Sequence, residues 1–537
     1  MAFAKKPEHL ARLCVAAKLR FLEYRHPVHG HLKTTASGRF QAHLGLGKVL
    51  ANRGRQTDGP RFVVSNSAVF DHNLHKDCRR GCYPCNFASA TALAPVAGSI
   101  VFLISCSDTM RRSLLTLLLA LAPLPAAAQP RLDALQSEID RRTAAITDKL
   151  TEWRHDIHQH PELSNFEVRT ARLVSDHLKA LGLEVRTEVG GHGVVAVLRG
   201  GKPGPVVALR AEMDALPVVE QVNVPFKSTT KTVYNGVETG VMHACGHDGH
   251  TAMLLAAAKH IAQKGQFSGT VNLIFQPAEE GLGGAVKMME DGLFTKYPCN
   301  AIFAMHNMPS HPQGKLVFRD GPAMASSDNV TITLEGVGGH GAVPHKAVDS
   351  IVAGSAIVMA LQTIVSRNVD PLHTAVVTVG ALHAGQAKNV IPALATMELS
   401  VRALDPQVRQ LLEQRIKALV VAQAESFGVK ADIDWRPGYS VLVNSAAETD
   451  FARQVALALV GPERVTLNGP ALTGSEDFAF MLEKVPGSYL LIGNGDGDSA
   501  GACMVHNPGY DFNDDNIATG AAYWAALVQA YLATEKD

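Results

Sequence analysis

The chain has 537 residues, of which 46% are hydrophobic and 19% are charged, so extensive disorder is excluded and a large core can form. Basic and acidic residues number 50 each, and this balance argues against a nucleic-acid-binding protein, which needs a basic excess. The average conceals two compositions, because residues 1–109 carry 15 basic and 6 acidic residues and five of the eight cysteines.

Residues 1–109 show no sustained helical or strand period, and we interpret them as unstructured or as translated upstream sequence. Met110 begins a segment with two arginines, a leucine-rich run and three alanines, the order of a secretory signal peptide over residues 110–128. We therefore expect translation to start at Met110 and the protein to be exported, periplasmic or secreted, without a stable membrane anchor. The alternatives are a buried core helix, or a membrane-anchored form that uses the apolar residues 87–105.

Three cysteines of the first segment, Cys78, Cys82 and Cys85, have a CxxxCxxC spacing that resembles the iron–sulfur motif of radical S-adenosylmethionine enzymes. No strand–helix repeat follows this motif, and a predicted signal peptide does, so we interpret the spacing as chance. The cysteines of the remaining chain are far apart, which does not indicate a disulfide framework.

Residues 131–327 alternate between helical and strand patterns, which predicts an α/β domain. Two β-branched runs, at 194–200 and 205–217, are typical of buried strands in a parallel sheet. Helices are predicted over residues 169–183 and 250–264, and a strand that runs into a polar loop over residues 269–281.

The pattern changes from about residue 329 onward, to a strand, a helix, two strands, a helix and a strand. These elements are expected at residues 329–336, 347–367, 374–383, 395–404, 406–427 and 430–435. The order is that of a ferredoxin-like unit. We therefore predict an α/β fold with a ferredoxin-like α+β domain inserted at residues 328–436, and the α/β domain resuming at residues 437–535.

Several polar side chains that can bind a metal ion lie next to the predicted strands and helices of the α/β domain. The loop MHACGHDGH places Cys245 and His247 just before a helix, where a thiolate and an imidazole can face one cation. Glu279 and Glu280 follow a buried strand, where one carboxylate can bind a metal while its neighbour acts as a base, although such a pair is also common in solvated turns. With two loop histidines, the candidate ligands are Cys245, His247, Glu280, His306 and His506, which leaves Glu279 free.

Several ordered motifs between about residues 150 and 515 resemble the amidohydrolase branch of the M20 metallopeptidases. The matching segments are ALRAEMDALP, MHACGHDGHTAMLL, LIFQPAEEG, AMHNMP, GVGGHGAVPH, QAKNVIP, SEDFAF and VHNPGYDFND. That branch contains hippurate hydrolases, N-acyl-amino-acid amidohydrolases and auxin-conjugate hydrolases. The resemblance implies a catalytic domain with two divalent metal ions (zinc, manganese, cobalt or nickel) and an inserted lid domain that forms a homodimer.

The resemblance also implies roles for individual residues. It implies the five ligands already identified, with Glu279 as general base and acid and Asp214 as a carboxylate that supports a metal ligand. In the lid, it implies that His340 polarises the scissile carbonyl, across the dimer in many members, and that Asn389 and Arg402 hold the substrate carboxylate. A loop histidine and a solvated arginine remain the alternatives for His340 and Arg402. The sequence departs from the branch in having Glu212 where aspartate is usual and Val505 where leucine is usual.

These features predict a metal-dependent amidohydrolase that cleaves the amide bond of N-acyl or N-aroyl amino acids. A dipeptidase or carboxypeptidase of the same superfamily is the first alternative. An inactive ligand-binding homologue is the second, although the retained ligands and base argue against it.

Overall fold

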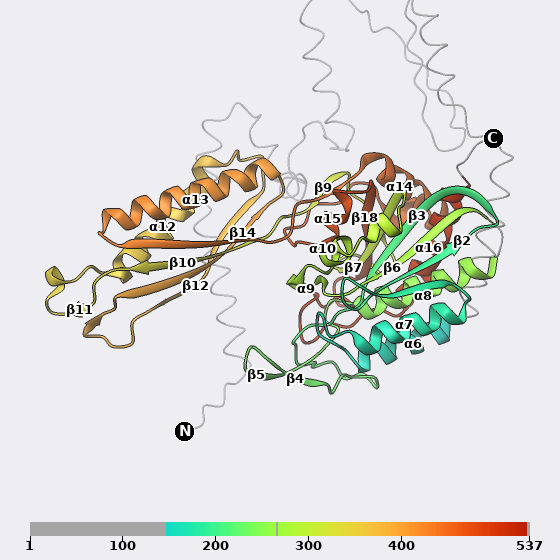
Figure 1. Cartoon of the computed structure of the whole chain (residues 1–537), viewed down its shortest axis with the longest axis horizontal. Coiled ribbons are helices and arrows are strands. Elements are labelled where there is room, and N and C mark those ends of the chain that lie inside the picture. Colours follow the sequence, from blue (N-terminus) through green and yellow to red (C-terminus); the bar gives the residue numbers. More distant parts are fainter. Residues whose placement is uncertain (1–146, 265–266, 534–537) are drawn as a thin grey trace, which may run out of the picture. The chain divides into compact units, whose positions relative to one another are not determined.

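The computed structural model describes residues 147–264 and 267–533 of the chain (Figure 1). The upstream segment 1–109 with its cysteine motif and the signal peptide expected at residues 110–128 lie outside the described residues. The described residues form a large α/β domain, which is interrupted by a smaller domain spanning residues 328–437. We refer to these as the large domain and the inserted domain.

An eight-stranded sheet forms the centre of the large domain, in the spatial order β1-β2-β6-β3-β7-β18-β8-β17. The strands are β1 (Glu184–Val189), β2 (Gly193–Arg199), β3 (Lys202–Glu212), β6 (Ser268–Gln276), β7 (Ala301–Pro309), β8 (Leu316–Val317), β17 (Val465–Thr466) and β18 (Gly487–Gly495). Strands β6, β3, β7 and β18 run parallel to one another. Their carboxyl ends therefore meet at one edge of the sheet.

The prediction of parallel strands is wrong for β2, which runs antiparallel to both of its neighbours, β1 and β6. Only Gly200 and Gly201 separate β2 from β3, and a parallel crossover needs a dozen or more residues. The apolar run in β2 arises because Val194 to Val197 are buried, and burial by itself does not reveal strand direction.

Helices cover both faces of the sheet because its strands alternate between two apolar cores. In β3, Val207 and Leu209 belong to one core and Ala208 to the other. The first core includes α6 (Thr147–Gln159), α7 (Val168–Ala180), α8 (His247–Lys264), α14 (Ala446–Val460) and α16 (Asp515–Leu532). The second includes α10 (Gly284–Glu290), α11 (Leu293–Lys296) and α15 (Phe478–Leu482).

The inserted domain has a four-stranded antiparallel sheet in the order β12-β14-β10-β15, packed against two helices. Its main elements are β10 (Asp328–Glu335), α12 (Ser350–Asn368), β12 (Ala375–Ala384), β14 (Leu394–Ala403), α13 (Pro406–Ser426) and β15 (Lys430–Pro437). This is the ferredoxin-like strand order. The predicted α/β fold with an inserted ferredoxin-like domain is confirmed.

The two helices of the inserted domain begin where the sequence supplies capping side chains. Asp349 accepts hydrogen bonds from the amides of Ile351 and Val352 at the start of α12, and Asp405 does the same for the first turn of α13, where Pro406 is the first helical residue. Among the described residues, α12 is the one helix that is long and apolar enough for a membrane span. One face of α12 packs into the core of the inserted domain, whereas its side chains Ile351, Val352 and Met359 are exposed.

Short elements complete the described chain. They are β4 (Lys231–Tyr234), β5 (Val237–Gly240), α9 (Glu279–Leu282), β9 (Gly321–Met324), β11 (Gly339–His340), a 3₁₀ turn at Pro344–Lys346, β13 (Val390–Ile391), β16 (Leu442–Asn444) and a 3₁₀ turn at Pro462–Arg464. Strands β4 and β5 form a hairpin, β9 pairs with β16, and β11 pairs with β13.

Candidate metal centre

The predicted ligands gather at the carboxyl-end edge of the parallel strands. Glu279 and Glu280 follow β6, and His306 lies in the second half of β7, which is separated from β6 by β3. Cys245 and His247 lie at the start of α8, which packs against this sheet. The edge formed by the carboxyl ends of parallel strands is where α/β folds usually hold their ligands, because the connecting loops converge there.

A strained turn after β6 presents the two glutamates. Ala278 has a left-handed backbone with φ of 54°, and Glu280 and Gly281 are not helical, so α9 is a distorted turn. Gly284 allows the chain to fold back, since a Cβ atom there would lie 1.7 Å from the carbonyl oxygen of Pro277. The turn brings carboxylate oxygens of Glu279 and Glu280 and a ring nitrogen of His247 within 4.8 Å of one another.

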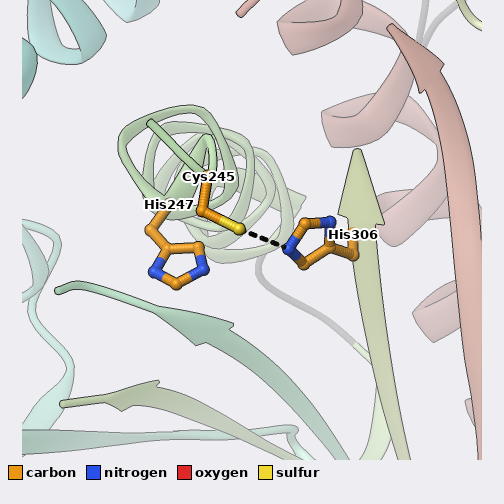
Figure 2. A group of neighbouring side chains, drawn as sticks. All are labelled: Cys245, His247 and His306. Atoms are coloured by element: carbon orange, nitrogen blue, oxygen red, sulfur yellow. Dashed lines mark hydrogen bonds between the residues drawn. The ribbon is translucent and has the colours of Figure 1, made fainter. Parts of the chain in front are cut away.

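The five predicted ligands form two groups that share one thiol. The donor atoms of Cys245, His247 and His306 lie within 4.8 Å of one another, as do those of Cys245, Glu280 and His506. Figure 2 shows the Cys245 sulfur directed at the His306 ring, with Sγ 3.3 Å from Nε2. The Nε2 atom of His506 lies 3.3 Å from the same sulfur and 3.3 Å from Oε1 of Glu280. This arrangement suits two cations with Cys245 between them.

The electrostatic surroundings of Cys245 also indicate that its thiolate form requires a nearby cation. Burial raises the pKa of its thiol well above the usual value, and the nearby carboxylates of Glu280 and Glu279 raise it further. Without a cation, the sulfur therefore keeps its proton and remains a poor ligand. Positive charge from a metal would reverse this preference and stabilise the thiolate.

The buried imidazole of His247 is oriented as metal-binding histidines usually are. Its Nδ1 lies 2.9 Å from the carbonyl oxygen of Asp214 and 3.2 Å from the Asp214 carboxylate, whereas its Nε2 is buried without a hydrogen-bond partner. Burial lowers the pKa of His247, but the carboxylates of Asp214, Glu212 and Glu280 together outweigh burial and raise the pKa to about 10. Ser164 and the amide of Glu280 donate to Asp214, which fixes the carboxylate. The orphaned Nε2 fits a metal ligand whose tautomer is set by Asp214.

The His306 side of the site is held by Asn307. The Nδ1 atom of His306 lies 2.6 Å from the Asn307 carbonyl oxygen, which leaves Nε2 for the centre. The Asn307 side chain donates to the Cys245 carbonyl at 2.6 Å and accepts from the Tyr510 hydroxyl at 2.8 Å. His250 is engaged at both nitrogens, by Glu212 at 2.9 Å and by the Asn307 amide at 2.9 Å. His250 therefore supports the site and does not present a free donor to a metal.

A buried arginine pairs with carboxylates next to Glu279, and the sequence did not indicate its role. Arg210 in β3 contacts Glu212, Glu476 at 2.7 Å and Asp477 at 3.0 Å, all of them buried. Carboxylate oxygens of Glu279, Glu476 and Asp477 lie within 4.8 Å of one another. Burial raises the pKa of Glu279 well above its usual range, and the charges of Glu476 and Glu280 add to this effect. The motif SEDFAF, which contains Glu476 and Asp477, marked these two carboxylates in the sequence, but it did not indicate that Arg210 is their partner.

A second buried arginine fixes the first turn of α8. Arg154 of α6 lies 2.8 Å from Asp248 and 2.8 Å from Asp511, and His158 lies 2.9 Å from Asp248. Burial would raise the pKa of Asp248, but Arg154 and His158 hold it well below its usual range. Asp248 is the neighbour of His247, so this ion-pair network anchors the helix end that carries a candidate ligand.

Replacing Arg154 with methionine is expected to lower the free energy of unfolding by about 3–5 kcal/mol, because the buried carboxylate of Asp248 would lose its arginine partner and keep only His158. Chemical denaturation measures this change. Arg172→Met is the control, since its 3.8 Å pair with Asp176 is exposed and should contribute less than about 1 kcal/mol. Equal effects of the two substitutions would contradict the assignment of Arg154 as an anchor.

The predicted lid residues do not join the metal-binding groups of the described chain. His340 is exposed on β11, where its Nδ1 accepts a hydrogen bond from the Ala342 amide at 3.1 Å. Asn389 is exposed beside it, with its carbonyl 2.8 Å from the Gly341 amide. Arg402 is half-buried on β14 and donates to the Thr473 carbonyl at 3.0 Å. Their predicted roles therefore stay predictions.

Comparison with known proteins gives matches over most of the large and inserted domains. The model of the family described as peptidase family M20/M25/M40 matches residues 208–530. The chain is 45% identical to the hippurate hydrolase of Campylobacter jejuni over 379 residues, which cover 71% of this chain and 95% of that protein. It is 38% identical to thermostable carboxypeptidase 2 of Saccharolobus solfataricus, over 71% of this chain and 95% of that protein.

A solved structure also matches closely. It is that of the Bacillus subtilis YXEP protein, described as a dinuclear metal binding peptidase from the M20 family. The TM-score is 0.62 at 33% identity, and the match covers 73% of this chain and 99% of that one. The similarity therefore extends over both the large and the inserted domain.

Proposed function

Because the chain belongs to the peptidase M20/M25/M40 family, whose members are metal-dependent hydrolases, we propose that it hydrolyses the amide bond of N-acyl or N-aroyl amino acids. The products are a carboxylic acid and an amino acid. The observation that carries the proposal is the paired donor set around Cys245, with the buried carboxyl group of Glu279 beside it.

We propose that Cys245, His247, Glu280, His306 and His506 would hold two divalent ions, since the two groups of donor atoms both include Cys245. The mixed sulfur, nitrogen and oxygen donors suit zinc, and also manganese, cobalt or nickel. When bound there, two divalent ions would supply Lewis-acid chemistry for an amide carbonyl and a water molecule. Asp214 fixes the His247 ring so that Nε2 faces the centre.

Glu279 performs the proton transfers in this proposal. Its carboxylate takes a proton from the attacking water and later delivers it to the leaving amine. Burial and neighbouring carboxylates favour the protonated form of Glu279, which suits the second transfer, and the charge of two cations favours the ionised form that the first transfer needs.

The inserted domain supplies the remaining groups. His340 lies in β11, and Asn389 directly precedes β13, the strand that pairs with β11. We propose that His340 polarises the scissile carbonyl, from the partner subunit of a homodimer, and that Asn389 and Arg402 bind the substrate carboxylate. Exposed apolar side chains on the inserted domain support a lid-mediated dimer; they are Ile351, Val352, Met359, Leu382, Val390 and Leu394.

A carboxypeptidase or dipeptidase activity is the second candidate, which the similarity to a thermostable carboxypeptidase favours. The two functions differ in whether the substrate has an acylated or a free α-amine. An inactive ligand-binding homologue is disfavoured, since all the predicted ligands and Glu279 are retained and assembled.

The test is an assay of amino-acid release from hippurate, acyl amino acids and free dipeptides, with and without a chelator. We expect release from the acylated substrates, loss of activity with the chelator and recovery on adding metal. Release from free dipeptides alone would favour the peptidase reading. No release by a metal-loaded protein would favour the ligand-binding homologue.

A further inference from the structure

The chain returns from the inserted domain to the large domain through Tyr439, and this side chain reaches the turn that carries Glu279. The Tyr439 hydroxyl donates a hydrogen bond to the carbonyl oxygen of Glu279 and accepts one from the amide of Gly283 at 3.1 Å. The residue is buried, with 9% of its surface exposed. A side chain from the domain connection therefore contacts the backbone of the proposed base.

We propose that Tyr439 is a positioning residue, which holds the Glu279 turn from the connection to the inserted domain. The proposal rests on the proposed function in one respect only, since it takes Glu279 to be the base. The contacts of Tyr439 with the turn are independent of that role.

The turn needs such a partner because its backbone lacks the hydrogen bond that would close a regular helical turn. In a regular helix, the amide of residue 283 would donate directly to the carbonyl of residue 279. Here Gly281 and Gly283 have φ values of 80° and 66°, and the Tyr439 hydroxyl bridges the two groups in place of the direct bond. At the other end of the turn, Glu167 accepts from the Ala278 amide at 2.8 Å. Glu279 is thus fixed from both sides.

Tyr439 is itself tied to the outgoing connection. Its carbonyl accepts from the Ser327 amide at 3.0 Å, and its amide donates to the Ser327 hydroxyl at 3.2 Å. Gly438 lies so close to Ser327 that a Cβ atom would be 2.5 Å from the Ser327 carbonyl oxygen. Next to this crossing, Arg409 of α13 binds the buried carboxylate of Asp328 through two nitrogens, at 2.6 and 2.9 Å.

These contacts link the inserted domain to the base through a single hydroxyl. The crossing of the two connections fixes the Tyr439 backbone, and the Phe480 ring packs edge-on against its ring at a centroid distance of 6.1 Å. Removing the hydroxyl leaves the ring in place but frees the Glu279 carbonyl and the Gly283 amide. The Glu279 carboxylate would then sample misaligned positions, which lowers the rate of proton transfer more than it weakens substrate binding.

The test compares Tyr439→Phe with Tyr523→Phe in the full chain. Tyr523 in α16 is a matched control, because its buried hydroxyl also donates to a backbone carbonyl, that of Ala452 at 3.0 Å. We expect Tyr439→Phe to lower kcat about tenfold at an almost unchanged KM, with metal content unchanged. Hydrogen exchange of the peptide that contains Gly283 should be faster than in the wild type. Tyr523→Phe should change neither quantity.

The proposal is overturned if Tyr439→Phe retains the wild-type kcat and the wild-type exchange rate near Gly283, or if Tyr523→Phe lowers kcat equally. A wild-type protein that cleaves none of the assayed amides would instead refute the proposed function. In that case, the exchange measurement alone still decides whether Tyr439 holds the turn.

Discussion

Replacing Glu279 with glutamine is expected to lower kcat by roughly 10³-fold, the scale of lost general acid–base catalysis, while both metal ions stay bound. Glutamine has nearly the same shape, so it can occupy the same buried space, but it cannot take a proton from water. The proposed ligand set uses the carboxylate of Glu280, which lies with Cys245 and His506, although Glu279 also lies near His247 and Glu280. The rate of amide hydrolysis and the metal content per chain measure the two parts of the prediction.

Glu290→Gln is the matched control for this substitution, since Glu290 is an exposed glutamate at the end of α10. It should leave kcat and metal content unchanged. An unchanged kcat in Glu279→Gln would remove Glu279 from the role of base. Loss of metal from that variant would make it a ligand instead.

Replacing Cys245 with alanine should have the largest effect on metal binding. The thiol is shared by the group with His247 and His306 and the group with Glu280 and His506, so both ions lose a ligand at once. Loss of a residue that only supports a ligand weakens metal binding by about 10- to 100-fold, and we expect the loss of a shared ligand to weaken it by at least about 100-fold. Competition with a chelator of known affinity measures this change, and hydrolysis should fall with occupancy.

Cys299→Ala provides the control, because Cys299 is a half-buried free cysteine that packs beside the second core of the large domain. It should bind metal as the wild type does. If Cys245→Ala retained two ions with wild-type affinity, the shared-thiol geometry would be wrong, and the remaining histidines and glutamate would have to form the centre alone.

Three of the five candidate ligands could be proposed from the sequence because they lie in short local patterns, whereas His306 and His506 are single histidines in loops after apolar runs. Cys245 and His247 are two residues apart at a helix start, and Glu280 follows a buried strand. The inserted domain was predictable for a similar reason, since the apolar residues of its strands and helices repeat with distinct periods. The direction of a strand is harder to predict from sequence. The strand β2 was wrongly predicted to be parallel, because a strand that is buried on both faces is apolar in either direction.

The residues that support the ligands were not predictable, because their partners are far away in the chain. Arg210 contacts Glu476 across 266 positions, and Arg154 contacts Asp511 across 357. Tyr439 lies in a loop whose sequence contains no recognisable motif. Its hydroxyl reaches the Glu279 carbonyl because the two connections to the inserted domain are hydrogen-bonded to each other at Ser327 and Tyr439. A single sequence records which residues can bond but not which pairs the fold brings together.

Stepwise metal reconstitution tests the central claim most directly. The protein would be stripped with a chelator, supplied with zinc, manganese, cobalt or nickel in fractions of an equivalent, and assayed for release of the amino acid from hippurate. The predicted result is no activity without metal and full activity at two ions per chain. Full activity in the stripped protein, or a maximum at one ion per chain with no further binding, would contradict a two-metal amidohydrolase.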